Sequence, residues 1–324
     1  MRDIASITSA ALVILGVGLG SAMAEDKYPS KPVRVVIGYA AGGYLDTVSR
    51  IFFRSVEDTL GQPFVIENRP GAAGQIGAGI VATAKPDGYT LLVAADSHSV
   101  SAALRKNQQY DALKDYTFVR KMTISQTALY VPSNSPFQSI EDYVKAANEQ
   151  PGKVTFATSG VGSGPNLTAL RFLMAAGADM THVPYKSVGE SILATVGGQT
   201  DSTWGGVTTA SPYIEDGKLR VLAVAALKRL SYLPDVPTLS EEGYGDIQGN
   251  VWAGVMGPAN LPGAILEALE GALHKASQDP EVKKKIAELR YTIVDVDGAK
   301  FKAETEKEIG VMREVAERFG IAMQ

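Results

Sequence analysis

A strand-like run that ends in a glycine pair dominates the first part of the chain. Residues 33–37 read Val-Arg-Val-Val-Ile, and the small residues that follow end in Gly42 and Gly43. From Asp46 onward the apolar residues recur at helical instead of alternating spacing. The stretch therefore predicts a strand, a tight loop and a helix, which is the repeating unit of an α/β protein.

This loop also predicts an anion-binding site. Backbone N–H groups at the start of a helix carry partial positive charge and bind an anion without help from Arg or Lys. An ordinary turn, whose glycines only satisfy backbone geometry, is the alternative. The glycine spacing matches neither GxGxxG nor GxxxxGK[ST], which disfavours a dinucleotide or a P-loop nucleotide.

The N-terminus has the pattern of a secretory signal peptide. Arg2 precedes an apolar run at residues 10–19, and the small residues Ala22 and Ala24 flank Met23. We expect cleavage after Ala24 and an exported mature chain. A membrane anchor is the alternative, but the run is shorter than the roughly 20 residues that a span needs.

Composition excludes several kinds of site. The 324 residues contain no cysteine, which excludes disulfides, thiolate metal sites and cysteine nucleophiles. Three widely separated histidines give no metal-binding spacing, and a net charge of −4 with both signs scattered gives no footprint for nucleic acid. We therefore expect no metal, no cofactor and no nucleic-acid partner, and a chain that acts as a monomer.

The strand–loop–helix pattern occurs twice. Residues 28–94 predict a parallel βαβαβ unit, and the pattern restarts with a strand at 153–157, a glycine-rich loop at 158–165 and a helix at 166–176. In open α/β sheets, ligands bind at the carboxyl ends of the strands. Two such loops in two lobes would face one another across a cleft.

Short motifs in a fixed order identify a family resemblance. They are YPSKPVR at 28–34, GQP at 61–63, ENRPGA at 67–72, KPDGYT at 85–90, PGK at 151–153, HVPYK at 182–186, GKLR at 217–220 and LPDVPT at 233–238. From residue 28 to the C-terminus, this ordered set resembles the tripartite tricarboxylate transporter substrate-binding proteins, often called Bug receptors.

The resemblance implies a fold and a function. The fold is a two-lobed periplasmic binding protein, a type II-like α/β clamshell in which helices flank a mixed, mostly parallel sheet in each lobe. Residues 25–124 and 228–324 would form lobe 1 and residues 125–227 lobe 2, with hinges near 121–127 and 225–229. The function is capture of a small carboxylate, with a dicarboxylate as the expected class, and delivery to a two-component membrane permease.

The resemblance also implies the contacts with the ligand. In the family, backbone amides and hydroxyls of facing loops hold the carboxylate. Tyr39 would be an aromatic wall, and Asp46 would read a hydroxyl, an amine or a water, whereas Glu67, Asn68 and Arg69 would brace the loop. The expected contact residues are Tyr39, Ala40, Gly42, Gly43, Tyr44, Asp46, Ser97, His98, Ser159, Gly162, Ser163, Asn166, Thr203, Trp204 and Gly205.

Structural roles compete with several of these assignments. Asp46 and the two serines are also good helix caps, Trp204 is also a good core residue, and His98 is also a good structural histidine. The chain departs from the family pattern at Ala40, Ala41, Tyr44, Asn166, Gly205 and Gly206. The ligand therefore stays open among aliphatic di- or tricarboxylates, aromatic carboxylates and amino acids.

Two other functions remain as alternatives. The same lobes would serve a ligand sensor that docks on a membrane signalling partner. An exported hydrolase is suggested by the adjacent Ser97 and His98, but the chain has no GxSxG elbow. We therefore expect a receptor and no enzyme.

Overall fold

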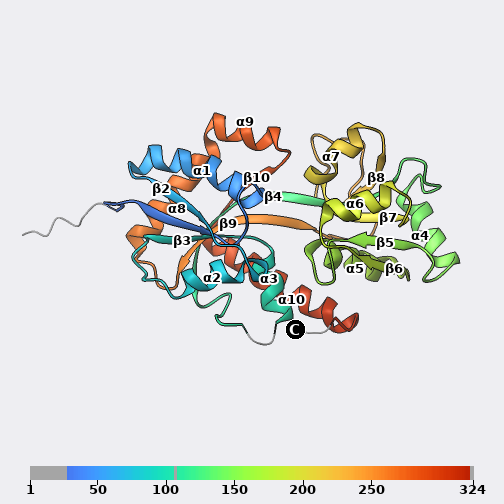
Figure 1. Cartoon of the computed structure of the whole chain (residues 1–324), viewed down its shortest axis with the longest axis horizontal. Helices are drawn as coiled ribbons and strands as arrows, with labels where there is room; N and C mark the ends of the chain where they lie inside the picture. The colour runs from blue at the N-terminus through green and yellow to red at the C-terminus, as the bar shows by residue number, and fades with distance from the viewer. Residues whose placement is uncertain (1–27, 106–107, 322–324) are drawn as a thin grey trace, which may run out of the picture.

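The computed structural model describes residues 28–105 and 108–321. Figure 1 shows two α/β lobes side by side, joined by long strands, which confirms the predicted two-lobed architecture. The expected signal peptide, with its cleavage after Ala24, lies outside the described residues. Among the residues described, no helix is long and apolar enough to cross a membrane.

The first lobe is built on the predicted βαβαβ unit. Strand β1 pairs in parallel with β2 on one side and β3 on the other, as expected from the sequence. The apolar face of α1 is buried against this sheet, with Phe52 and Val48 inaccessible to solvent. The elements are β1 (Val33–Ile37), α1 (Tyr44–Leu60), β2 (Phe64–Asn68), the 3-10 turn η1 (Ala72–Gly74), α2 (Gln75–Ala82), β3 (Thr90–Ala94) and α3 (Ser97–Leu104).

Two glycines allow α2 to approach β1 closely. A Cβ at Gly77 would lie 2.9 Å from the Cα of Gly38, and a Cβ at Gly38 would lie 2.5 Å from the Cα of Gly74. Because side chains at these positions would collide with backbone, glycine is required at the contact. The contact fixes the position of the end of β1, and Tyr39, which lines the cleft, comes directly after this contact in the chain.

Strand β4 (Tyr116–Pro132) belongs to both lobes. Its first part pairs antiparallel with β9 (Asn250–Pro258) and β10 (Thr292–Asp297) in the first lobe. Its last part pairs with β7 (Ser202–Gly206) and β8 (Leu219–Val224) in the second lobe. With β5 (Thr155–Thr158) and β6 (Thr181–Pro184), the overall strand order is β2-β1-β3-β9-β4-β7-β5-β6. The strand predicted at 127–131 is thus only the end of a much longer one.

The second crossing between the lobes lies at the start of β9. Leu230, Leu239 and Ile247 pack into the hydrophobic clusters of the second lobe. The chain therefore remains in that lobe beyond residues 225–229, where the sequence placed the hinge, and beyond the expected boundary at 227/228. Pairing with β4 determines this crossing, because β9 first meets the shared strand at Asn250, opposite Gln126.

The second lobe repeats the parallel arrangement around β5, which lies between β6 and β7. The predicted capping box is present, with Ser139 and Asp142 bonding each other's backbone N–H. Trp204 lies in the core, 5.3 Å from the ring of Phe172. The remaining elements are α4 (Ile140–Glu149), β5 (Thr155–Thr158), α5 (Gly164–Ala176), β6 (Thr181–Pro184), α6 (Val188–Val196) and α7 (Val207–Glu215).

The last helix packs against both lobes. Helices α8 (Gly263–Gln278) and α9 (Pro280–Glu288) pack near α1, and α10 (Gly298–Arg318) passes below β9 toward the second lobe (Figure 1). Phe301 of α10 packs in a first-lobe cluster, whereas Met312 belongs to the core of the second lobe. The helix is therefore part of both hydrophobic cores.

Candidate functional site

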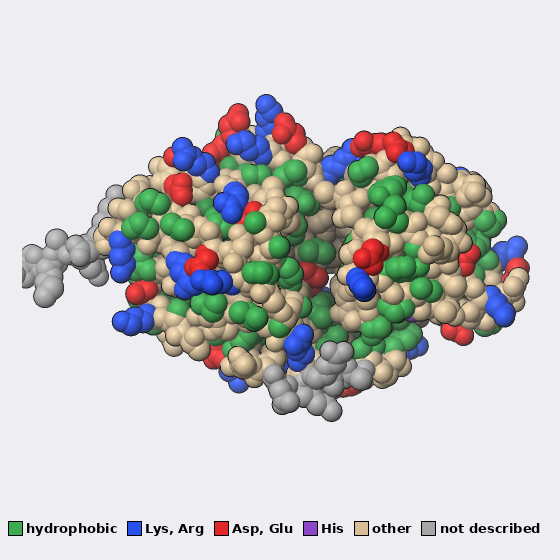
Figure 2. All heavy atoms as spheres, viewed as in Figure 1, with side chains coloured by type: hydrophobic (Ala, Val, Ile, Leu, Met, Phe, Trp, Pro, Cys, Tyr) green, Lys and Arg blue, Asp and Glu red, His purple; other side chains and the backbone are tan. Residues whose placement is uncertain are grey.

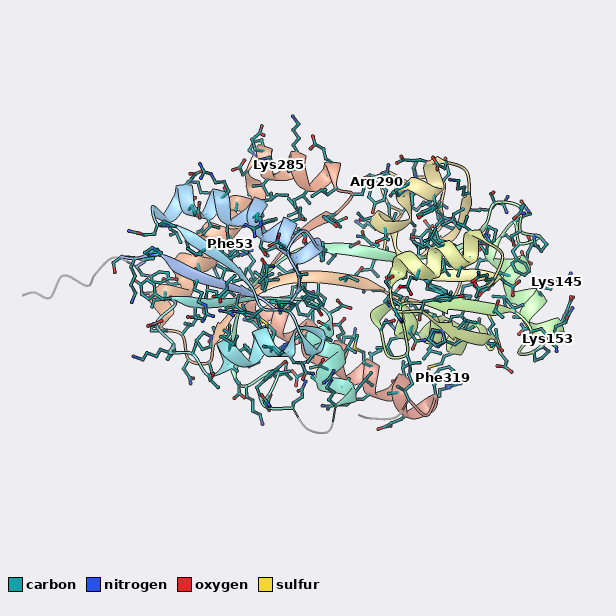
Figure 3. All side chains as sticks on the ribbon, in the orientation of Figure 1. Phe53, Lys145, Lys153, Lys285, Arg290 and Phe319 are labelled. Atoms are coloured by element: carbon teal, nitrogen blue, oxygen red, sulfur yellow. The ribbon has the colours of Figure 1, made fainter. Side chains whose placement is uncertain are left out.

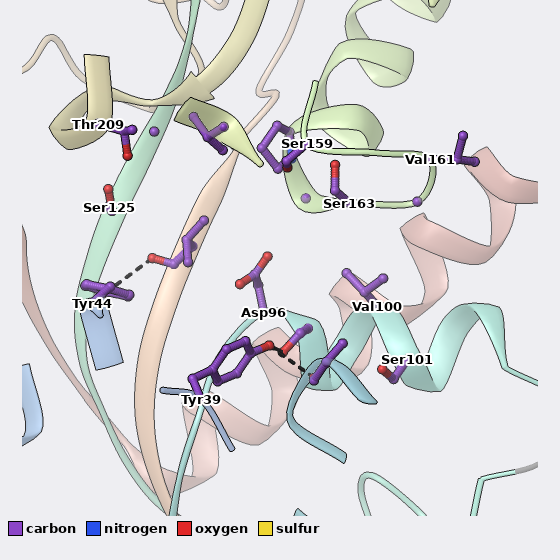
Figure 4. A pocket seen from close by; sticks show the side chains of 18 of the residues that line it. Tyr39, Tyr44, Asp96, Val100, Ser101, Ser125, Ser159, Val161, Ser163 and Thr209 are labelled. Carbon is purple, nitrogen blue, oxygen red and sulfur yellow. Dashed lines mark hydrogen bonds between the residues drawn. The ribbon is translucent and has the colours of Figure 1, made fainter. Parts of the chain in front are cut away.

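A cleft of about 720 Å³ lies between the lobes. Figure 2 shows the hollow that separates the two halves of the surface, with acidic and basic side chains scattered over both. Tyr39, Tyr44 and Ser97 line the first-lobe wall, and Ser159 and Ser163 line the facing wall (Figure 4). The structure thus brings together these predicted residues from both lobes.

Asp46 shapes the first loop from behind. Its carboxylate accepts a hydrogen bond from Gly42 N–H at 2.9 Å and is paired with Arg50. The Arg50 guanidinium holds the pKa of Asp46 below its ordinary value, and the Gly42 N–H assists. Asn68 braces the same loop, as expected, by donating to Tyr39 O at 3.0 Å. Asp46 is buried and is not among the residues that line the cleft.

Two tyrosines form the first-lobe wall. Tyr39 donates a hydrogen bond to Ser97 Oγ at 2.5 Å, and burial raises the pKa of Tyr39 to about 12. The Tyr44 hydroxyl lies 2.9 Å from Thr123 Oγ1, and its ring lies 4.6 Å from that of Tyr291. Burial raises the pKa of Tyr44 as well, so both phenols favour their neutral form in the first-lobe wall.

The facing loop is held by residues at the start of α5. Gly162 has a φ of +73°, and its N–H donates to the buried Asn166 Oδ1 at 2.9 Å. Ser163 caps the helix and donates its own hydroxyl to Gly160 O at 2.8 Å. Within the described chain, no hydrogen bond engages the hydroxyl of Ser159, which leaves this group free to contact a ligand in the cleft.

Five helices begin at the walls of the cleft. The residues at their starts that line it are Tyr44 of α1, Ser97 of α3, Gly164 of α5, Val188 of α6 and Gly206 before α7. The first N–H groups of a helix have no partner within the helix, and its N-terminus carries partial positive charge. Their convergence makes the cleft a strong candidate for binding an anion.

The charged side chains at the cleft are few. Arg105 of the first lobe and the exposed Lys186 of the second line it, and Asp96 is the acidic residue among the described lining residues. Burial raises the pKa of Asp96 to about 7, and the nearby carboxyl of Glu308 adds to the rise. The cleft therefore has two cations and one buried carboxyl.

Several predicted residues lie away from the cleft. His98 is buried, with Nε2 2.9 Å from Ala112 O, and burial lowers its pKa. Thr203 bonds Ala157 O inside the second lobe, and Asn166 serves the loop. Trp204, Gly205, Ala40, Gly42 and Gly43 are also absent from the lining.

Other lining residues were not expected from the sequence. Thr208 and Thr209 follow Gly206 at the start of α7, and Ser125 and Tyr291 lie near the hinge. The glycine between β7 and α7 repeats the signal seen at Gly43 and in the loop before α5. That repetition is the sequence signal that could have pointed to the two threonines.

The comparisons with known proteins agree with this geometry. The family model described as "Tripartite tricarboxylate transporter family receptor" matches residues 48–315. A Cupriavidus necator protein described as "UPF0065 protein in gbd 5'region" is 34% identical over 319 residues, which cover 97% of this chain and 95% of the relative. The chain belongs to the tripartite tricarboxylate transporter receptor family. The resemblance noted in the sequence is therefore confirmed.

Two solved structures with bound ligands are similar to this receptor. MatC from Rhodopseudomonas palustris, solved with bound malate, is 29% identical, and the match covers 89% of the receptor and 99% of MatC with a TM-score of 0.73. R. palustris Rpa4515, solved with adipate, is 27% identical over 91% of the receptor and 99% of that chain, with a TM-score of 0.77. Family and fold are those of periplasmic solute-binding receptors.

Proposed function

We propose that the receptor captures a small carboxylate, with a dicarboxylate as the class, and delivers it to a two-component membrane permease. The single observation that carries the proposal is the convergence of five helix N-termini on the cleft, which favours an anion without a dedicated cation at its centre. Arg105 and Lys186, one from each lobe, support a second carboxylate nearer the mouth.

The ligands of relatives support this size and charge. Malate and adipate, seen in the two R. palustris proteins, are both dicarboxylates. A cleft of about 720 Å³ falls within the usual range for small-molecule sites, roughly 300–1,000 Å³. The unbonded Ser159 hydroxyl supplies a donor for a carboxylate oxygen.

Ligand contact with both lobes would favour the closed state. A ligand shifts the equilibrium between open and closed forms only by its differential affinity for the two. Thr208 of the second lobe and Tyr291 of the first both line the cleft, so that a bound solute would touch both. Closure would then present a surface that a permease recognises.

A receptor accounts for these residues better than a hydrolase does. Ser97 accepts a hydrogen bond from Tyr39, and the buried His98 ring is bonded to Ala112 O. The two residues therefore do not form the nucleophile–base pair that an exported hydrolase would need. A sensor for a membrane signalling partner would use the same pocket, and only the identity of the membrane partner would distinguish a sensor from a transport receptor.

We further propose that the receptor is exported, is processed after Ala24 and acts as a monomer.

A thermal-shift screen of residues 25–324 tests the proposal. The panel contains aliphatic dicarboxylates, tricarboxylates, aromatic carboxylates and amino acids, with neutral sugars and a polyamine as controls. A ligand that binds the native state raises the melting temperature in a concentration-dependent way. We expect a rise with a carboxylate class. A rise with sugars or the polyamine alone would refute the anion site.

A further inference from the structure

Asp96 directs a buried carboxyl across the cleft. It follows β3 and precedes α3, and the backbone N–H groups of Ser97 and of Asp96 itself lie close to its carboxylate. The residue is 9% exposed, and Figure 4 shows its carboxylate directed toward the loop that carries Ser159 and Ser163. Asp96 therefore presents its carboxylate to the site where a ligand would lie.

The carboxylate faces the N-terminus of α5. A Cβ built on Gly164, the first residue of that helix, would lie 2.6 Å from Asp96 Oδ2. A negative side chain of one lobe thus lies beside the partial positive charge of a helix in the other. The base of the cleft has one partner for an anion and, beside it, one partner for a cation.

The described residues give Asp96 no cationic partner. Lys121 and Arg171 line a second cavity behind the hinge, which Asp96 also borders. Lys121 is paired with Glu304 at 2.7 Å, and Arg171 donates to Gln248 O at 3.0 Å. No side chain of the described chain donates a hydrogen bond to the Asp96 carboxylate.

This arrangement is unfavourable for a ligand that carries only carboxylates. A carboxylate bound at the start of α5 would lie close to that of Asp96, and like charges at short range repel each other. A ligand with a protonated amine on the carbon next to its carboxylate satisfies both partners at once. Its carboxylate meets the helix N-terminus and its ammonium meets Asp96.

We infer that Asp96 is a specificity-determining residue and that the solute is an α-amino acid, with an acidic side chain that reaches toward Arg105 and Lys186. The inference rests on the proposed function, because it presupposes that a carboxylate binds in this cleft. It narrows the class from dicarboxylates in general to those that also carry an ammonium group.

Matched ligand pairs test the inference. Isothermal titration at pH 8 compares L-aspartate with succinate and L-glutamate with glutarate, which differ only by the amine, and malate replaces the amine with a hydroxyl. We expect the wild-type receptor to bind an amino member at least tenfold more tightly than its partner. Asp96→Asn should remove most of this preference. Asp58→Asn, an exposed position on α1, should leave it unchanged.

The outcomes separate the two proposals. If succinate or glutarate binds as tightly as its amino counterpart, or if Asp96→Asn keeps the preference, the inference is overturned while the carboxylate receptor stands. If no carboxylate binds but a neutral or cationic solute does, the proposed function itself fails. Malate that matches aspartate would also overturn the requirement for an ammonium group.

A second readout does not depend on the variant's folding. Around Asp96 lie Tyr39, Tyr44 and Glu308, with Arg171 and Lys121 beyond. An ammonium ligand favours charged Asp96, so binding near pH 7 should release protons and affinity should rise from pH 6 to 8. Proton uptake, measured by titration in two buffers of different ionisation enthalpy, would contradict the inference.

Discussion

Arg50 holds the carboxylate of Asp46 with two hydrogen bonds, Nε to Oδ2 at 3.0 Å and Nη2 to Oδ1 at 2.9 Å, one turn along the same helix. The same carboxylate accepts Gly42 N–H. Asp46 therefore acts as the support of the loop. Because Asp46 does not line the cleft, its mutation should affect the loop and not the choice of ligand.

Asp46→Ala should destabilise the receptor by about 1–2 kcal/mol, because it removes a charged hydrogen bond from Gly42 N–H. The lost ion pair with Arg50 adds little, since the Arg50 side chain is half exposed. Urea unfolding measures the loss. All carboxylates should lose affinity together, since the loop as a whole is loosened. A change in which ligand is preferred would instead make Asp46 a direct reader of the solute. Asp58→Ala, exposed on the same helix, is the control.

Gly77→Ala should destabilise the fold by about 1–3 kcal/mol, since the new Cβ would press on the backbone of Gly38 at 2.9 Å. Gly79, on the same helix, is the matched control because a Cβ there meets nothing within 4 Å. Gly79→Ala should be neutral or stabilising by up to about 1 kcal/mol. Chemical unfolding of both variants checks the contrast, and equal effects would contradict the close approach.

Ser159→Ala should weaken carboxylate binding by about 1–3 kcal/mol, the loss of a hydrogen bond to a charged group, and leave the ligand-free melting temperature unchanged. Ser163→Ala should lower stability by about 1 kcal/mol, because Ser163 caps α5 and bonds Gly160 O. Calorimetric titration and thermal unfolding of both variants separate the roles. Unaltered affinity in Ser159→Ala would remove this serine from the site.

Arg290 joins the lobes on the side of α7. It donates to Ser211 Oγ at 2.7 Å and pairs with Glu215, and Figure 3 shows it at the junction between the lobes. Arg290→Ala should open the ligand-free receptor and weaken binding by about 1 kcal/mol, roughly fivefold. Small-angle scattering should show a larger radius of gyration. Arg54→Ala, exposed on α1, should leave both unchanged.

The ligand-free receptor should lose stability as pH rises from about 4 to about 7. Asp96 has a raised pKa of about 7, so the folded state favours its protonated form. The contribution of Asp96 to the free energy of unfolding is complete below its pKa in the unfolded chain, about 4, and is lost between pH 4 and 7. The total loss is at most about 4 kcal/mol. Asp96→Asn should flatten the pH dependence of the unfolding free energy. A slope identical to that of the wild type would refute the assignment.

The sequence predicted the features that depend on neighbouring residues alone, namely strands, turns and helix caps. The β-branched run of β1 with the glycines after it, and the apolar run of β3, define the first unit without distant contacts. The Ser139 capping box was equally readable, because both partners lie within one turn. Family resemblance then supplied the lobes and the facing loops.

The remaining features depend on partners far apart in the chain. His98 sits in a polar stretch that fits a ligand contact as well as a structural residue, and only its approach to Ala112 O decides between them. Strand β10 takes its place in the sheet by pairing with β4, which lies far earlier in the chain. For Asp46 a local clue existed, since Arg50 four residues later is well placed for an ion pair.

The position of α10 has a consequence for how the receptor is made. Ser99 of α3 bonds Glu308 of α10 across 209 residues of sequence, and Met312 completes the core of the second lobe. Contacts this distant slow folding, because a long loop must close before they form. Neither core is complete until the last helix has emerged. A nascent chain that stays unfolded until then remains competent to be threaded through an export channel.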